Sequence, residues 1–314
     1  MKNLEPLYKT LFHNTNGFVL NWPIGKNVRI GDFFSMSDKR INVVGNIYDS
    51  YFQLDIKDKF ASDIQSFAAP VLEPFIESVG VWESFVPLPH IWQLEMGCDS
   101  NYLSKKMLTP HKKKVNPPEV NQYITTLSEP GSFFLVCKDV QYLRMPHFKA
   151  IRHEVIRRLT TEFFNFNKIF LITEIALIRE LSYGVSKTDN AEVIFSLDTY
   201  PNGDLTDLLI SEQPFDVERA VGLEHLKLRA KGGALAFKAK KMQLSLKARD
   251  ILIREIAQSS EAQIQKYAVN LMDSELFHLF PKIEINPANA NEFFEWTELS
   301  LEDVEHFLGM GPTD

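Results

Sequence analysis

The stretch of sequence that most constrains the fold is LKLRAKGGALAFKAKKMQLSLKA, residues 226–248. Apolar side chains alternate with polar, mostly cationic ones before and after Gly232-Gly233, and the register slips once, at Lys240-Lys241. A period of two places the two kinds of side chain on opposite faces of a β-strand. The pattern predicts a two-sided ribbon with a glycine turn, one face on the core and the other basic.

This ribbon contains seven cationic side chains and no acidic one. A basic surface attracts the anionic headgroups of a membrane, at about 1 kcal/mol for each cation near the surface. We therefore predict a lipid-binding role for Lys227, Arg229, Lys231, Lys238, Lys240, Lys241 and Lys247. The simpler interpretation is an ordinary hairpin whose basic face is only solvated.

The charge along the chain is uneven, although the formal net charge is −7. Residues 226–254 hold nine basic groups and one acid, whereas residues 255–314 hold 12 acids against Lys266 and Lys282. A basic segment thus precedes an acidic one directly. Such asymmetry indicates either an intramolecular pairing of the two segments or two separate solvated faces.

The rest of the chain predicts an α+β fold, a twisted, mainly antiparallel β-sheet with packed amphipathic helices and a helical C-terminal tail. Apolar residues at helical spacing predict helices at residues 4–12, 60–79, 146–163 and 250–280. Strands are predicted near residues 17–36, 41–52, 131–145, 168–185 and 191–197. The last two of these flank a polar SKTDN segment and are expected to pair as a hairpin. Residues 295–309 predict an acidic helix that begins at an N-cap, Ser300, with Asp303 three residues later.

The motifs of common enzymes do not occur in this sequence. There is no GxxxxGK[ST] phosphate loop, no GxSxG and no HExxH, so we expect no catalytic activity, cofactor or metal. DTYPNGDLTD is better explained as a turn than as a calcium loop, because a leucine, Leu209, replaces the bidentate glutamate. Phe237 is the one aromatic residue of the basic ribbon, and the whole chain is acidic, so nucleic acid is not an expected partner. Two cysteines and no apolar run of 18 residues favour the cytoplasm.

Two segments of the chain resemble the gasdermin N-terminal pore-forming domain. KIFLITEIALIRELSYGV is similar to a gasdermin strand of the form VYVVTEV, and LKLRAKGGALAFKAKKMQL to a later segment that reads roughly GSTLAFRV; the corresponding residues are 169–175 and 233–239. NGFVLNWPIGKNVRIGDFF and VVGNIYDSYF resemble the opening strands of bacterial gasdermins. The resemblance covers about residues 1–255. It departs from the lipid-modified N-terminal cysteine of many bacterial members, because no cysteine precedes Cys98.

The resemblance implies a pore-forming domain, residues 1–257, held inactive by a C-terminal segment, residues 258–314. It implies a cytoplasmic monomer that an activating protease releases, and that then binds anionic lipid, oligomerises in the inner membrane and kills the cell, for instance in antiphage defence. By the same resemblance, strands near residues 83–137 and 171–230 enter the membrane, and the inserting side chains are expected to include Ile172, Ile175, Leu177, Val193, Phe195 and Leu197. The tail residues expected to inhibit are Phe293, Phe294, Trp296, Leu299, Phe307 and Leu308.

Two other functions are open on the sequence. The basic ribbon and acidic tail suit a lipid-binding or protein-interaction module that forms no pore. An enzyme whose active site is assembled from distant residues is the third possibility.

Overall fold

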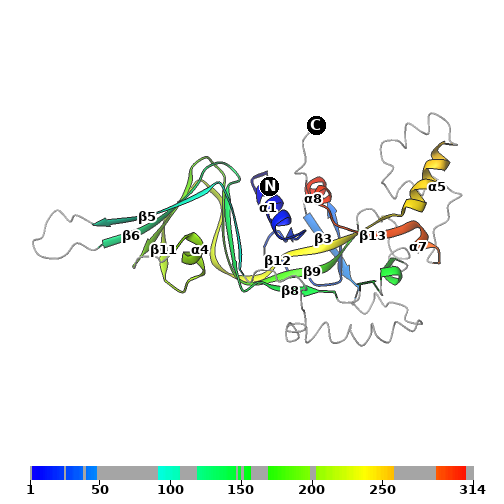
Figure 1. Cartoon of the computed structure of the whole chain (residues 1–314), viewed down its shortest axis with the longest axis horizontal. Helices are drawn as coiled ribbons and strands as arrows, with labels where there is room; N and C mark the ends of the chain where they lie inside the picture. Colours follow the sequence, from blue (N-terminus) through cyan, green and yellow to red (C-terminus); the bar gives the residue numbers. More distant parts are fainter. Residues whose placement is uncertain are drawn as a thin grey trace, which may run out of the picture. The chain divides into compact units, whose positions relative to one another are not determined.

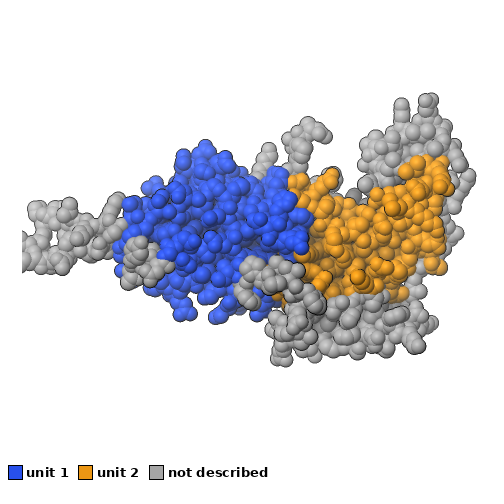
Figure 2. Space-filling view, in the orientation of Figure 1, with its two compact units in different colours: residues 1–26, 84–141, 176–235 blue, residues 27–83, 142–175, 236–314 orange. Residues whose placement is uncertain are grey.

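The computed structural model describes residues 2–24, 26–37, 40–47, 91–106, 119–145, 148–149, 152–156, 169–198, 203–257 and 288–308. The fold is α+β with mainly antiparallel sheets, as predicted (Figure 1). The chain divides into two compact units (Figure 2). The first comprises residues 1–26, 84–141 and 176–235, and the second residues 27–83, 142–175 and 236–314.

The described elements follow one another in this order. The N-terminal part contains η1 (Lys2–Leu4), α1 (Glu5–Asn14), β1 (Val19–Leu20), β2 (Asp32–Ser37), β3 (Arg40–Asn46), β4 (Trp92–Met96), β5 (Cys98–Lys106), β6 (Glu119–Leu127), β7 (Phe133–Lys138) and β8 (Gln141–Arg144). The C-terminal part contains β9 (Phe170–Ser186), β10 (Ala191–Leu197), α4 (Leu205–Ile210), β11 (Phe215–Val221), β12 (Leu223–Leu244), α5 (Leu246–Ala257), α7 (Ala290–Phe293), β13 (Phe294–Glu298) and α8 (Leu301–Leu308).

The strands form two sheets. The larger has the order β1-β12-β9-β2-β3 along its main path, with β13 paired to β12, β4 to β7, and β7 and β8 to β9. The smaller has the order β11-β10-β6-β5. The predicted hairpin between residues 168–185 and 191–197 is therefore wrong, because β10 pairs with β6 and β11 and does not pair with β9.

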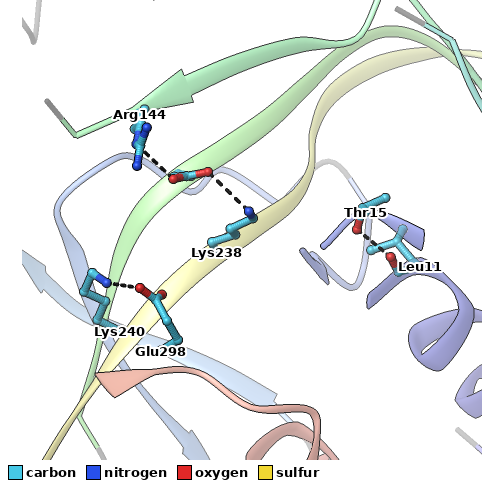
Figure 3. Close-up of polar contacts among 7 residues, drawn as sticks. Leu11, Thr15, Arg144, Lys238, Lys240 and Glu298 are labelled. Carbon is cyan, nitrogen blue, oxygen red and sulfur yellow. Dashed lines mark hydrogen bonds and ion pairs between the residues drawn. The ribbon is translucent and has the colours of Figure 1, made fainter. Parts of the chain in front are cut away.

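The N-terminal helix is confirmed. α1 buries Leu7, Tyr8 and Leu11, and it ends where the Thr15 amide and hydroxyl both donate to the Leu11 carbonyl, at 3.0 and 2.5 Å (Figure 3). Of the other predicted helices, residues 60–79 lie outside the described residues. Residues 148–149 and 152–156 are helical within the predicted 146–163 helix. α5 overlaps the start of the predicted 250–280 helix but begins at Leu246, so residues 246–248, predicted as the end of the ribbon, are helical instead.

The first unit buries its core between the smaller sheet, β7 and α4. β10 alternates as the sequence predicts, with Ala191, Val193, Phe195 and Leu197 inward and the intervening side chains half-buried. These side chains pack with Phe134 of β7 and with the leucines of α4. The sequence predicts a turn over residues 198–207, whereas residues 205–210 form α4; the capping box between Asp204 and Asp207 is the local signal for this helix.

The second unit is built around buried phenylalanines. Phe34 of β2 stacks on Phe170 of β9 with ring centroids 5.4 Å apart, and meets the ring of Phe237 edge-on at the same distance. All three rings are fully buried. Such offset and edge-to-face pairs add to the free energy gained by burial.

The predicted glycine turn in the basic ribbon is wrong, because β12 is one continuous strand of 22 residues. A Cβ on Gly232 would lie 2.0 Å from the carbonyl oxygen of Ile178. The glycine is therefore needed where the backbone of β9 approaches that of β12. In the sequence alone, a Gly-Gly pair that allows two strands to approach closely cannot be told from one that forms a turn.

Candidate functional site: the basic strand and its C-terminal cover

The C-terminal segment adds a strand to the basic strand. β13 pairs antiparallel with the end of β12, so that Lys240 lies opposite Glu298, Met242 opposite Trp296 and Leu244 opposite Phe294. The acidic helix predicted over residues 295–309 is corrected in its first part, where residues 294–298 are extended, whereas α8 begins at Leu301, directly after the predicted N-cap Ser300. The strand forms because the edge of β12 supplies hydrogen-bonding partners that a local pattern does not reveal.

Acidic side chains of the tail pair with the cations of the basic strand. Lys240 pairs with Glu298 (Figure 3), Lys241 with Asp303, and Lys247, at the start of α5, with Glu292. The Lys241–Asp303 pair is the most shielded, with side chains 24 % and 15 % exposed, whereas Glu298 is 71 % exposed. Ion pairs at the surface contribute about 0.2–1 kcal/mol each, so the shielded pair contributes most.

A fourth cation of the ribbon is paired within the second unit itself. The Lys238 ammonium lies 3.7 Å from one oxygen of Glu174, whose other oxygen lies 3.1 Å from the guanidinium of Arg144 (Figure 3). One carboxylate of β9 therefore serves two cations. The sequence analysis does not predict Glu174 as part of the site. A single acidic residue within the apolar run KIFLITEIAL is the sequence feature that could have drawn attention to it.

Apolar and aromatic contacts anchor the tail. Phe294 and Leu299 are buried, and the Leu299 amide donates to the Ala239 carbonyl at 2.9 Å. Trp296 is half-buried; its indole Nε1 donates to the carbonyl oxygen of Arg152 at 3.0 Å, and its ring meets that of Phe148 edge-on with centroids 5.7 Å apart. The Lys240 ammonium lies 5.2 Å from the centre of the same phenylalanine ring.

The start of α8 is fixed by the predicted cap. The Asp303 amide donates to Ser300 Oγ at 3.1 Å, and the Ser300 amide donates back to Asp303 Oδ2 at the same distance. The other oxygen of Asp303 accepts from Lys241. One aspartate thus both begins the helix and ties it to the basic strand.

The predicted inhibitory residues belong to these tail elements. Phe293 is half-buried at the end of α7, and its carbonyl accepts from the Ser245 amide at 2.8 Å. Phe307 and Leu308 lie in the last turn of α8, and their side chains are outside the described set.

The predicted lipid-binding cations of the first unit are placed differently. Lys227 and Lys231 are exposed. Arg229 is half-buried, and its guanidinium donates to the carbonyls of Leu208 and Gln213. This arginine therefore serves the first unit's own packing.

The predicted membrane-inserting side chains are in protein cores here. Ile172 and Ile175 are buried in the second unit, Val193, Phe195 and Leu197 in the first, and Leu177 is half-buried. Contact of these side chains with lipid would require each to leave its present packing.

Other kinds of site are not evident in the described part of the chain. Its His, Cys, Asp and Glu residues form no group of three or more that could hold a metal ion. Within those same residues, no helix is long and apolar enough to cross a membrane.

Comparison with family models, with curated proteins and with solved structures finds no match to this chain.

Proposed function

We propose that this chain is an autoinhibited, non-enzymatic pore-forming protein of gasdermin type, in which the C-terminal segment covers a basic lipid-binding surface. The observation that carries the proposal is the pairing of β13 with β12, together with the ion pairs of Lys240, Lys241 and Lys247 with tail acids. While β13 is in place, these cations are neutralised by the protein itself. A membrane would compete for them only after the strand had left.

Cutting the chain between α5 and α7 is a physically reasonable trigger. While the tail is tethered, β13 rebinds at the high effective concentration that its linker imposes. Once cut, the same strand must bind as a separate molecule, which costs at least about 4 kcal/mol of lost translational and rotational freedom. In the described part of the tail, five residue pairs between β12 and β13, three partly exposed ion pairs and the buried Phe294 and Leu299 must offset that cost.

The smaller sheet supports the second step, insertion into the membrane. In β10 one face is apolar and the other is polar or mixed, with Glu192 and Ser196 on the outer side. An alternating strand can present one face to hydrocarbon and the other to water, provided that its edges are paired with other strands. Self-association of several copies would supply those edges.

In this proposal the covered chain is a cytoplasmic monomer, and the released chain assembles on an anionic membrane such as the inner membrane. The antiphage setting and the activating protease are parts of the same proposal. Further amphipathic helices packed on the sheet, and helical structure in the rest of the tail, also stay predictions.

The alternative is a lipid-binding or interaction module that forms no pore. The same edge of β12 favours it, because adding an extended segment to a sheet edge is a common mode of peptide recognition, and β13 is added to β12 in this way. One experiment separates the two functions.

The test uses the full chain with a recognition sequence for a site-specific protease inserted between residues 258 and 287. Dye-loaded vesicles of phosphatidylcholine, with and without phosphatidylserine, are mixed with cut and uncut protein. The proposal expects dye release only from the anionic vesicles and only after the cut. Binding without release supports a lipid-binding module, and an absence of binding by the cut chain contradicts both the pore and a lipid-binding module.

A further inference from the structure

Helix α4 covers the apolar face of the smaller sheet in the first unit. Its Leu205, Leu208 and Leu209 are buried in one cluster with Tyr123 of β6 and Phe195 of β10. With six residues, α4 is too short to be stable as an isolated helix in water. Contacts with the rest of the unit must therefore hold it in place.

Two cationic side chains hold the C-terminal end of α4. Arg229 of β12 donates from Nη2 to the carbonyl oxygens of Leu208, at 3.0 Å, and Gln213, at 2.7 Å. Lys138 of β7 donates from Nζ to the carbonyl oxygen of Ile210 at 3.2 Å. The last carbonyls of a helix have no partner within it and carry the negative end of its dipole, so cations suit this position.

Both the backbone and the side chain of Arg229 are in energetically unfavourable arrangements. Its backbone φ is 45°, in the left-handed region that residues other than glycine seldom adopt, and its amide is fixed by Ser182 Oγ at 2.9 Å. The guanidinium lies 4.2 Å from the ring centre of Phe215, and its Nε is buried without a hydrogen-bond partner within the described chain. A buried donor with no partner favours the open state, where water can reach it.

We propose that Arg229 and Lys138 form a latch that keeps α4 over the apolar face of the smaller sheet. Opening of the latch uncovers Val193, Phe195 and Leu197. Because the latch lies in the first unit and the tail contacts lie in the second, different variants can test the opening of α4 and the removal of β13. Only the membrane consequence of opening rests on the proposed function.

The latch is tested on the full, uncut chain in the absence of lipid. Arg229→Met keeps the length of the side chain but removes its donors, and Lys138→Met does the same for the lysine. Arg179→Met is the matched control, because Arg179 is an exposed arginine of the same unit, paired with Asp139. Hydrogen exchange at residues 205–211 is expected to be about tenfold faster in each latch variant and unchanged in the control. Exchange in β7 and β9 is expected to stay as in the parent chain.

Arg229→Lys retains a charge and a donor and is expected to restore part of the protection. The latch is refuted if exchange at residues 205–211 is unchanged, or if it rises together with exchange in β7 and β9, which would indicate general destabilisation. Dye release by the cut chain then tests the consequence separately: it is expected to be faster in Arg229→Met than in Arg179→Met. Equal rates of dye release in these two variants, together with the expected change in hydrogen exchange, would overturn the role of the latch in membrane entry. A cut parent chain that never releases dye would instead contradict the proposed function itself.

Discussion

The indole Nε1 of Trp296 donates a 3.0 Å hydrogen bond to the carbonyl oxygen of Arg152, which lies more than 140 residues away in the chain. The same indole meets the ring of Phe148 and lies opposite Met242. Trp296 therefore joins β13 to the helical residues 148–149 and 152–156 as well as to the basic strand.

Replacement of Trp296 by alanine is expected to loosen β13 selectively. The loss of one aromatic pair and one hydrogen bond costs about 2 kcal/mol. Hydrogen exchange at residues 294–298 should be about 30-fold faster as a result. Trp296→Phe keeps a ring but not the donor, and should show a smaller effect. Equal exchange in the alanine variant and the parent would show that the indole does not hold the strand.

Two of the three ion pairs of the tail are expected to differ in strength, those of Asp303 and Glu298. Asp303→Asn should cost about 2 kcal/mol, since its carboxylate is shielded and also caps α8. Glu298→Gln should cost less than about 0.5 kcal/mol, since that carboxylate is largely exposed. Added salt should erase the second effect and leave most of the first. Hydrogen exchange of α8 and β13 at low and high salt measures both; a larger effect for Glu298 would contradict the assignment.

A methyl group at Gly232 is expected to disrupt the first unit. Gly232→Ala places a Cβ 2.0 Å from the carbonyl oxygen of Ile178, which is backbone and cannot rotate away. The free energy of unfolding should fall by about 3 kcal/mol. Lys231→Ala, at the exposed neighbour, should change it by less than about 0.5 kcal/mol. Urea unfolding of the two variants is the measurement, and similar midpoints would refute the close approach of β9 and β12.

Stability is expected to fall in alkali because of Tyr8. Burial in α1 raises the pKa of this phenol above the ordinary value of 10.0. The unfolded chain then releases its proton at a lower pH than the folded chain, so unfolding is favoured from about pH 10 upward, by up to about 1.4 kcal/mol for each pH unit. Tyr8→Phe removes this contribution. The difference in unfolding free energy between variant and parent should shift in favour of the variant between pH 9 and about pH 11.5; a constant difference would contradict the burial of the phenol.

Local sequence signals were sufficient for elements that their own residues specify. The spacing of Leu7, Tyr8 and Leu11 predicts α1, and the alternation from Ala191 to Leu197 predicts the buried face of β10. The Ser300 cap also lies where the sequence predicts it, because capping depends on residues three apart.

The errors arise where a distant segment decides the structure. Gly232-Gly233 has the signal of a turn, but Ile178 lies against it, and the strand continues. Residues 294–298 have an acidic, helix-like composition, but they form a strand because they pair with the edge of β12. The β-forming residues Phe294, Trp296 and Thr297 are the local signal for that strand. The distribution of charge along the sequence was enough to suggest that the acidic tail pairs with the basic segment. The contacts of Trp296 with Phe148 and Arg152, and of Lys238 with Glu174, could not be predicted without the fold.

A reversible covalent link between β12 and β13 tests whether β13 must leave β12 before the membrane is permeabilised. Gln243 and Glu295 lie opposite each other in β12 and β13. Directly opposed residues in antiparallel strands have Cα atoms about 4.5–5.5 Å apart, which is within the range of a disulfide. The pair is replaced by cysteines in a Cys98→Ser chain that carries the protease site between residues 258 and 287, and each single cysteine variant serves as a control. We expect the cut, oxidised protein to release no dye from anionic vesicles until a reductant is added. Release at the same rate before and after reduction would show that β13 does not have to leave β12.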